Sequence, residues 1–407
     1  MVRDLAALFH LAARNVFRNP RRSLLVVLTV AAGAGSLFLF DGFNTGILNQ
    51  YREGTIHSRF GHGELNTAGY REQVFEKPWE HWIQDPTPIM DKLKTLPGVQ
   101  HVFPRIGFFA LLTKGGISLS GRGQGIDGAE EAKFFTKLRI SDGVTLSDQP
   151  DGILLGQGLA HSLGAKPGDT VTVLANTIYG SINGADLTVV GIFLTGTKEF
   201  DDSGFRIPLS VAQTLLDTKS IESIALGLNT LEDWDPVSKA IAGPGSGLEA
   251  TPFAVLDKVF YQNAVDWLSS QFQIIKYIIF FIVILGIFST VSTSVLERKE
   301  EVGNLRANGE SRLNVLSLFL AEGALLGFAG AFLGLALVLI FNNTVLANGF
   351  VMPPSPGLTR SFRVFVELQP SSALETFFLG SACALVGTAI AAVKVVRLSI
   401  GEALRAI

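Results

Sequence analysis

Residues 296–312 read LERKEEVGNLRANGESR, a dense charge cluster between two long apolar segments. The segment before it, 274–295, is apolar apart from Lys276 and a few hydroxyl side chains. The segment after it, 315–341, is apolar apart from Glu322. Apolar runs of this length are typical of membrane-spanning helices. A charged link between two such helices has to lie in water, so this stretch is predicted to form an elbow on one side of a bilayer.

The composition also indicates a membrane protein. Of 407 residues, 47% are hydrophobic and 17% are charged, whereas soluble proteins carry about 25% charged residues. The formal net charge of -3 gives no basic field for nucleic acid, which we exclude as a partner. Cys383 is the single cysteine, so the chain can form no internal disulfide and no cysteine-based zinc site.

The N-terminal region, residues 1–22, is predicted to be an amphipathic helix at the cytoplasmic membrane interface. Its apolar side chains recur at helical spacing, and Arg3, Arg14 and Arg18 fall on the other face. A signal-peptide n-region is the alternative, but no small-residue cleavage site follows with the right flanks. Basic residues before the first span place the N-terminus in the cytoplasm.

The chain divides into four predicted spans with both termini in the cytoplasm. The expected segments are span one at 23–45, an extracytoplasmic domain at 46–271, span two at 272–296, the elbow at 297–312, span three at 313–342, a short outer loop at 343–370, span four at 371–396 and a cytoplasmic tail at 397–407.

The large segment between the first two spans is predicted to be an α+β domain. Expected strands, from β-branched content and turn residues at their ends, are 99–113, 117–126, 153–155, 170–174 and 187–193. Expected helices are 87–96, 209–216, 233–241 and 255–268. A β-rich lobe at 127–208 is expected to be inserted into this domain.

The elbow is the candidate functional site. One reading is a solvated helix face with paired charges, but Val302 and Leu305 would then be apolar side chains on a wet surface. We favour a short helix that docks this apolar ridge into a partner, followed by a reversal at Asn308-Gly309 and a cap at Ser311. The candidate coupling residues are Glu297, Arg298, Glu300, Glu301, Val302, Leu305, Arg306, Asn308 and Gly309. Aspartate at Val302 or Leu305 is expected to uncouple the partner and leave the fold intact.

Inside the third span, Glu322 is an intramembrane carboxylate, which is costly and normally faces protein or water. It could carry protons or substrate, but we favour a structural hydrogen bond to a neighbouring helix or to the interface. Small residues recur every four positions in the third and fourth spans, which is typical of close helix packing. These packing residues are Gly323, Gly327, Gly330, Gly334, Gly380 and Gly387.

No catalytic or metal site is expected. The chain has no GxxxxGK[ST] phosphate loop, and the five-residue spacing of His57 and His62 does not suit metal binding on a helix. No serine, histidine and aspartate set has a recognisable nucleophile elbow.

The elbow with the start of the third span, ERKEEVGNLRANGESR followed by LAEGALLG, resembles that of the FtsX/MacB-type (type VII) ABC transporter permeases. ARNVFRNPRRSLLVVLTVAAG is similar to their N-terminal signature, and ILLGQGLAHSLGAKPGDTVTVL, VVGIF and RIPLSVAQTLL are similar to their MacB-like periplasmic core domain. DGFNTGILNQYREGTIHSRFGHGELNTAGY is similar to the lipoprotein-releasing LolC/LolE branch.

The resemblance implies a non-catalytic permease of the bacterial inner membrane. It implies a second permease subunit, identical or not, surrounding membrane lipids, and a cytoplasmic ATPase that binds ATP and Mg²⁺, while this chain binds no cofactor. It implies extraction of lipoproteins from the outer leaflet and delivery to a periplasmic carrier or adaptor protein. A MacB-like efflux or mechanotransmission subunit and an FtsX-like regulator of cell-wall hydrolases remain alternatives. The substrate entrance implied at the outer ends of spans one and two comprises Phe38, Phe40, Phe43, Phe272, Ile275 and Ile279.

Overall fold

The computed structural model describes residues 2–73, 77–146, 151–243, 245–353 and 361–397. The chain falls into two compact units. The membrane unit comprises residues 1–49, 266–351 and 363–407, and the inserted domain comprises residues 50–265 and 352–362. Apart from Arg397, the expected tail at 397–407 lies outside the described residues.

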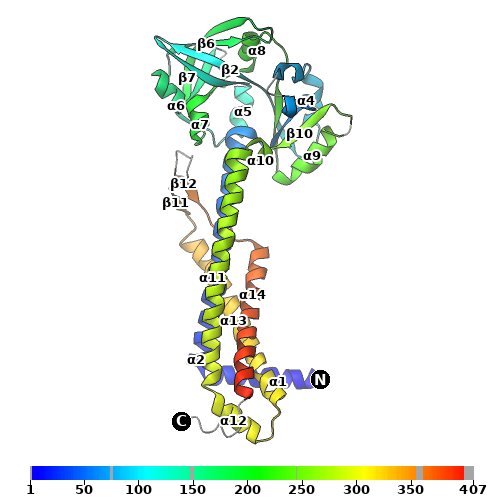
Figure 1. Ribbon diagram of the computed structural model, residues 1–407, viewed down its shortest axis with the longest axis vertical. Coiled ribbons are helices and arrows are strands. Elements are labelled where there is room, and N and C mark those ends of the chain that lie inside the picture. The colour runs from blue at the N-terminus through cyan, green and yellow to red at the C-terminus, as the bar shows by residue number, and fades with distance from the viewer. Residues whose placement is uncertain (1, 74–76, 147–150, 244, 354–360, 398–407) are drawn as a thin grey trace. The chain divides into compact units, whose positions relative to one another are not determined.

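The helices of the membrane unit confirm the prediction of four spans. The helices α2, α11, α13 and α14 are each long and apolar enough to cross a membrane. The elements of this part of the chain (Figure 1) are α1 (Val2–Arg18), α2 (Pro20–Thr55), α11 (Asn263–Leu296), α12 (Lys299–Ala307), α13 (Arg312–Thr344), β11 (Phe350–Met352), β12 (Phe362–Val364) and α14 (Pro370–Val396). Helix α2 is longer than the expected span at 23–45, and the boundary between the two units falls inside it, after Asn49.

Glycines bring three of the spanning helices into close contact. A Cβ at Gly330 would lie 2.6 Å from the Cβ of Val30 on α2, and a Cβ at Gly334 would overlap the carbonyl oxygen of Ala31. Two turns earlier on α13, Gly323 and Gly327 face α14 in the same way. Because no side chain separates these backbones, α13 packs directly on both α2 and α14.

The two predicted packing glycines of α14 differ from each other. A Cβ at Gly380 would lie 3.1 Å from the Cβ of Ala34 on α2, a tight contact. A Cβ at Gly387 would lie 3.5 Å from the Cα of Phe288 on α11, which is an ordinary van der Waals distance. Gly380 therefore belongs to the close α2 contact, whereas the position of Gly387 would accept a methyl group.

The inserted domain alternates strands and short helices, as predicted for an α+β domain. Its strands are β1 (Gly63–Thr67), β2 (Val99–Lys114), β3 (Ile117–Ile126), β4 (Arg139–Gly143), β5 (Gly152–Gly156), β6 (Thr170–Asn176), β7 (Ile182–Leu194), β8 (Gly204–Pro208), β9 (Ser223–Leu228) and β10 (Leu248–Pro252). Its helices are η1 (Ile56–Phe60), α3 (Tyr70–Gln73), η2 (Pro78–His81), α4 (Thr87–Lys94), α5 (Gly128–Phe134), α6 (Gln157–Leu163), α7 (Lys198–Ser203), α8 (Leu209–Leu216), η3 (Leu231–Asp233), α9 (Trp234–Ile241), α10 (Phe253–Leu256) and η4 (Lys258–Gln262).

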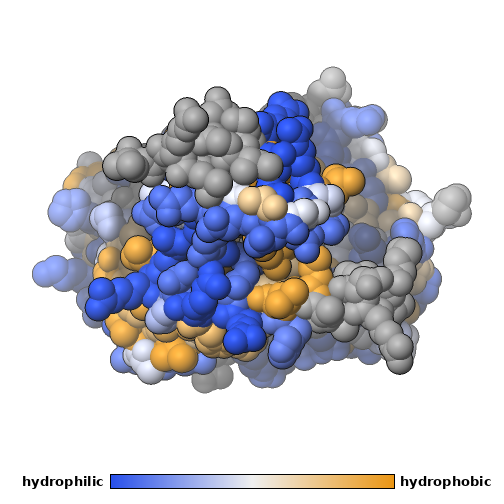
Figure 2. Space-filling model, turned by 90° about the horizontal axis from the view of Figure 1, so that it is seen from below, coloured by the Kyte–Doolittle hydropathy of each residue, from blue (hydrophilic) through white to orange (hydrophobic). Residues whose placement is uncertain are grey.

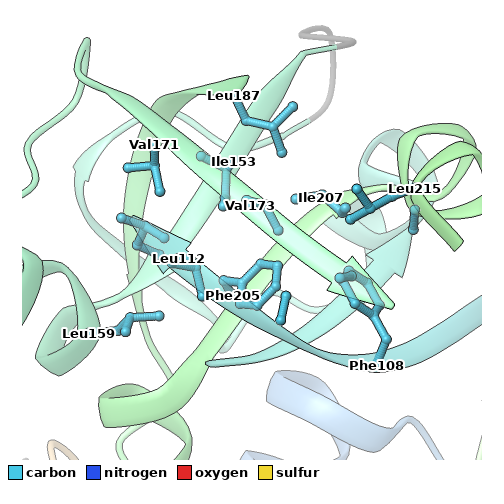
Figure 3. Packing of buried hydrophobic residues seen from close by; sticks show 14 of the residues in the cluster. Phe108, Leu112, Ile153, Leu159, Val171, Val173, Leu187, Phe205, Ile207 and Leu215 are labelled. Atoms are coloured by element: carbon cyan, nitrogen blue, oxygen red, sulfur yellow. The ribbon is translucent and has the colours of Figure 1, made fainter. Parts of the chain in front are cut away.

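The long strand β2 joins the two lobes of this domain. Its first half, from Val99 to Arg105, pairs with β9, which continues through β1 to β10. Its second half pairs with β3 and β6, and the strands β2, β3, β8, β5, β7 and β6 close into a ring. The core of that ring (Figure 3) includes Leu112, Ile153 and Phe205.

The expected boundaries of the β-rich lobe are therefore wrong. The ring needs the second half of β2 and all of β3, which precede residue 127, and helix α8 packs on it after residue 208. A lobe of β7, β5 and β8 without β2 and β3 would leave two open strand edges, and ring closure removes them.

The expected helix at 255–268 is also wrong. Helix α10 ends at Leu256, a π-helix follows at Lys258–Gln262, and α11 begins only at Asn263. The break falls at Asp257, whose buried carboxylate pairs with the guanidinium of Arg59. A carboxylate in the protein interior requires such a partner, so the chain turns here to reach it.

The close contact at Gly334 gives a first testable prediction. Gly334→Ala is expected to lower the melting temperature of the purified protein, since overpacking costs about 1–3 kcal/mol. Gly286→Ala on α11 is the matched control, because its Cβ would meet only Thr29 at 4.0 Å. Thermal unfolding in detergent measures both variants. Equal melting temperatures for the two would contradict direct packing of α13 on α2.

Candidate functional site

The elbow consists of the end of α11, the helix α12, a tight turn and the start of α13. The turn has Gly309 at φ 96°, and the N–H groups of Gly309 and Glu310 donate to the carbonyls of Arg306 and Leu305, both at 3.1 Å. Ser311 then caps α13, because its hydroxyl oxygen accepts a hydrogen bond from the N–H of Asn314 at 3.1 Å. The predicted reversal and the predicted cap are both confirmed.

The apolar ridge of α12 faces inward, contrary to the prediction that it docks into a partner. Val302 is 1% exposed and belongs to the hydrophobic core of the membrane unit, and Leu305 packs against that same core. The cluster also contains Val315 and Phe319 of α13 and Val395 of α14. Burial of apolar area favours this arrangement. Aspartate at Val302 would therefore place an unpaired charge in the core and disturb the fold itself.

The outward face of the elbow carries a different set of residues. Glu300, Asn304 and Ala307 follow one another at helical spacing on α12 and are exposed, as is the turn at 308–311. Leu313, in the first turn of α13, is 75% exposed. Figure 2 views the molecule from the end at which α12 lies and shows a continuous hydrophilic area bordered by hydrophobic side chains. This face is available to a partner, and it has one large apolar side chain at its edge.

A buried ion pair attaches the elbow to the third span. The guanidinium of Arg298, directly before α12, donates to both carboxylate oxygens of Glu322 on α13. The side chains of Arg298 and Glu322 are 12% and 7% exposed. Glu322 also accepts a hydrogen bond from the amide of Asn15 on α1 at 2.7 Å, and Arg298 stacks on the ring of Phe319 at 4.8 Å. The predicted hydrogen bond of Glu322 to a neighbouring helix is confirmed, and a further partner comes from the elbow.

The same network continues to the N-terminal helix. Glu301 accepts from Arg298 at 2.7 Å and from Arg18 of α1 at 2.7 Å. Burial alone would raise the pKa of Glu301, but the hydrogen bonds and charges of the two arginines outweigh it and lower that pKa. Arg298 shows the opposite balance: burial alone would lower its pKa, and Glu322 and Glu301 together raise it. Both groups are therefore held in their charged forms.

Two further candidate residues also turn toward the membrane unit. Glu297 pairs with Arg22 of α2 at 2.8 Å; Glu297 is exposed, and the side chain of Arg22 is 30% exposed. Arg306 donates to the carbonyl oxygen of Val396 at 3.2 Å, near the end of α14. Of the nine candidate coupling residues, Glu300, Asn308 and Gly309 remain on the free face, and the other six contact the membrane unit.

The candidate entrance residues are only partly brought together. Phe272 of α11 contacts Phe40 and Phe43 of α2, with ring centroids 6.2 and 6.4 Å apart, and Phe43 also stacks on Phe350 at 5.6 Å. We call Phe40, Phe43, Phe272 and Phe350 the aromatic cluster. Phe38 lies apart from it and is 2% exposed, so it faces the interior of the unit. Ile275 is 41% exposed and Ile279 is half-buried, on the same helix as Phe272.

Sequence reasoning missed the residues that connect separate elements. Asn15, Arg18 and Phe319 complete the elbow network, and Phe350 completes the aromatic cluster. One signal was present for the first group, because an intramembrane carboxylate such as Glu322 requires a donor. The sequence does not show that Arg298, among several nearby basic residues, is that donor.

The buried pair gives a second prediction. A double-mutant cycle with Arg298→Met and Glu322→Gln is expected to give a coupling energy of about 1–3 kcal/mol, as for buried charge-assisted hydrogen bonds. The matched cycle with Arg22→Met and Glu297→Gln, on an exposed pair, should give about 0–1 kcal/mol. Unfolding of the detergent-solubilised protein measures both cycles. Equal coupling in the two pairs would show that Arg298 and Glu322 do not hold the elbow.

Comparison with known proteins identifies the family. A MacB-like periplasmic core domain matches residues 23–243, and an FtsX-like permease C-terminal domain matches residues 274–400. The lipoprotein-releasing system transmembrane protein LolC of Neisseria meningitidis serogroup B is 28% identical, over 76% of this chain and 73% of that protein. LolE of Haemophilus influenzae is 23% identical, over 87% and 86%.

Among solved structures, the periplasmic region of MacB from Actinobacillus actinomycetemcomitans is similar, with a TM-score of 0.36 and 14% identity, covering 48% of this chain and 90% of that one. The two matching domains follow each other in the order expected from the four spans and the insertion, and the first of them covers more than half of the chain. The chain therefore belongs to the FtsX/MacB-type family of ABC transporter permeases.

Proposed function

We propose that this chain is the non-catalytic permease subunit of a transporter that extracts lipoproteins or other lipidated substrates from the outer leaflet of the bacterial inner membrane. The observation that carries the proposal is the extent of the similarity to lipoprotein-releasing permeases, which spans both the inserted domain and the membrane unit. A separate ATPase subunit that binds ATP and Mg²⁺ supplies the energy, and this chain contributes no cofactor.

The distribution of basic residues supports an orientation with both termini in the cytoplasm. Arg14, Arg18, Arg21 and Arg22 flank the start of the first span. Arg18 and Arg22 pair with Glu301 and Glu297, so this basic segment and the elbow lie at the same end of the membrane unit. Basic residues concentrate on the cytoplasmic side of membrane proteins. In this orientation the inserted domain is periplasmic, and a carrier or adaptor protein would meet it there.

The second span provides the surface for a lipid-modified substrate and for a second permease subunit. In its most apolar window α11 is 11% buried, against 28–44% for the other three spans. Ile278, Phe281 and Ile282 are among its exposed side chains, and the aromatic cluster lies on the same helix at Phe272. An acyl chain against such a surface stays out of water, where each exposed methylene group would cost about 0.8 kcal/mol.

The ATPase is proposed to bind the outward face of the elbow, which comprises Glu300, Asn304, Ala307, Asn308, Gly309 and Leu313. Motion of the ATPase then reaches α13 and α1 through the buried pair of Arg298 with Glu322 and through the core contact of Val302. A loosely held elbow would absorb that motion, whereas a packed and ion-paired one transmits it.

The free face gives a third prediction. Leu313→Asp is expected to weaken the complex with the ATPase by roughly tenfold, the equivalent of about 1.4 kcal/mol, and to leave the melting temperature unchanged. Val144→Asp, at an exposed apolar position of the inserted domain, is the matched control. Pull-down and ATPase stimulation measure the effect. Unchanged stimulation by the Leu313 variant would place the docking surface elsewhere.

The entrance gives a fourth prediction, which tests the substrate class. A photo-crosslinking amino acid at Ile275, an exposed position near the aromatic cluster, is expected to capture peptides with an acylated N-terminal cysteine. Addition of ATP to the complex with the ATPase should reduce that capture, because the substrate leaves. Mass spectrometry of the crosslinked adducts measures both results.

The control for this experiment is the same amino acid at Phe332 of α13, which is 70% exposed and outside the aromatic cluster. This position should capture phospholipid alone. If Ile275 also captures only phospholipid, with and without ATP, lipoprotein extraction is contradicted. A MacB-like subunit that transmits force to a periplasmic partner would then be the better account.

A further inference from the structure

The inserted domain contains a cavity of about 260 Å³, lined by none of the residues of the elbow or the aromatic cluster. Its walls come from the π-helix η1, the strands β3 and β8, the helix α7 and the turn at Asp257. Four cationic side chains and two anionic ones line it, together with phenylalanine rings. The excess of positive charge in a partly enclosed space is the feature that requires an explanation.

One of the two buried cations, Arg59, is incompletely paired. Its side chain is 6% exposed, and one guanidinium nitrogen donates to Asp257. The guanidinium stacks on the ring of Phe200 at 4.0 Å and lies 4.8 Å from the ring of Phe60. The other terminal nitrogen, Nη1, is buried and has no hydrogen-bond partner among the described residues. Buried donors are normally satisfied, so this nitrogen is positioned for an acceptor supplied by a ligand.

A second buried cation, Arg206 on β8, also has few close partners for its positive charge. Its guanidinium lies 3.4 Å from the carbonyl oxygen of Ser58 and 3.6 Å from Glu131, which at the same time binds Arg105 at 2.6 Å. Burial lowers the pKa of Arg206 to about 10; Glu131 opposes this shift, and the charges of Arg105 and Arg59 add to it. Burial also lowers the pKa of Arg59, although Asp257 opposes the shift.

Arg105 provides the internal comparison. It is equally buried, but the charges and hydrogen bond of its carboxylate partners outweigh burial and raise its pKa. The charge of Arg105 is thus compensated, although its Nη2, like Nη1 of Arg59, has no hydrogen-bond partner among the described residues. At Arg59 and Arg206, both of which line the cavity, the nearby carboxylates do not offset the effect of burial on the pKa.

The mouth of the cavity is more exposed and carries both signs of charge. Arg122 of β3 and Lys258 are exposed cations, and Glu199 of α7 is an exposed anion. Arg122 and Lys258 would attract a negatively charged ligand toward Arg59, whereas Glu199 would repel it. The volume exceeds that of a simple ion, and the rings of Phe60 and Phe200 provide an apolar wall for an organic group.

We propose that this cavity is a binding site for a phosphate group on a small organic molecule, either a free phosphate ester or the phosphoglycerol headgroup of a lipid. Arginine donates two parallel hydrogen bonds to phosphate oxygens, and the unpartnered Nη1 of Arg59 supplies a donor at the base of the site. Ligand binding would fix η1, α7 and the turn at Asp257 relative to one another.

The test is a calorimetric titration with glycerol 1-phosphate of the whole protein in nanodiscs of neutral lipid. Saturable binding of one equivalent is expected. Arg122→Gln should weaken it by roughly three- to fivefold, the range for exposed charge pairs, and Glu199→Gln should strengthen it to a similar extent. Arg139→Gln removes the same charge from exposed β4, outside the cavity, and should change nothing.

Arg59→Lys tests the base of the site, because lysine keeps the positive charge that pairs with Asp257 but lacks the planar guanidinium with its parallel N–H donors. The affinity for glycerol 1-phosphate should fall by roughly tenfold. Preparation in phosphatidylglycerol nanodiscs with native mass spectrometry distinguishes the two sources. A retained lipid that glycerol 1-phosphate displaces identifies the headgroup, and binding of the free ester alone identifies a soluble ligand. Absence of saturable binding in both preparations, or an equal effect of Arg139→Gln and Arg122→Gln, overturns the proposal.

Discussion

The ion pair of Arg298 with Glu322 is the interaction on which the elbow depends. The two charges lie in a poorly hydrated environment, where an unpaired carboxylate or guanidinium would be strongly unfavourable. Removal of either partner leaves the other buried and uncompensated. The pair therefore fixes the start of α12 against the first third of α13, and Asn15 and Arg18 extend the same constraint to α1.

Apolar packing and helix contacts complete this constraint. Val302 enters the core that α13 and α14 share, and the glycines of α13 let α2 and α14 approach without intervening side chains. The elbow is thus part of the packed membrane unit, and only its outward face is free to bind another protein. The proposed coupling to a separate ATPase needs an element of this kind, because force on the outward face would pass to the helices on which the elbow packs.

The sequence was sufficient for features that depend on local pattern. The four spans, the strand pair β2 and β3, helix α8, the reversal at Gly309 and the cap at Ser311 follow from hydrophobic length, alternation and turn chemistry. The direction in which Val302 points was predicted wrongly, because a short helix with one apolar side can bury it either in a partner or in its own chain. The prediction of a helix at 255–268 was wrong for a related reason. The partner of Asp257 is Arg59, almost two hundred positions earlier, and no local sequence pattern indicates this contact.

The location of the candidate site could be predicted from the sequence, but the contacts of its individual residues could not. The charged stretch between two spans marks the elbow, and an intramembrane Glu322 indicates that a donor must exist. Assignment of Arg298 to that donor, and of Glu300, Asn308 and Leu313 to the free face, needed the three-dimensional structure. The same holds for Arg59, whose unpaired nitrogen can be recognised only once its surroundings are known.

The most direct test of a rigidly held elbow is a distance between spin labels at Asn304 of α12 and Phe332 of α13, with Cys383 replaced by alanine. Both labelled positions are exposed. Because Asn304 lies on the proposed docking face, the measurement counts only where the labelled protein still binds the ATPase in a pull-down. If the elbow moves as one body with α13, double electron–electron resonance should give one narrow distance distribution. This distribution should not change when the proposed partner ATPase binds ATP. A distribution that shifts or broadens on ATP binding would contradict the account, because the elbow would then be a flexible link.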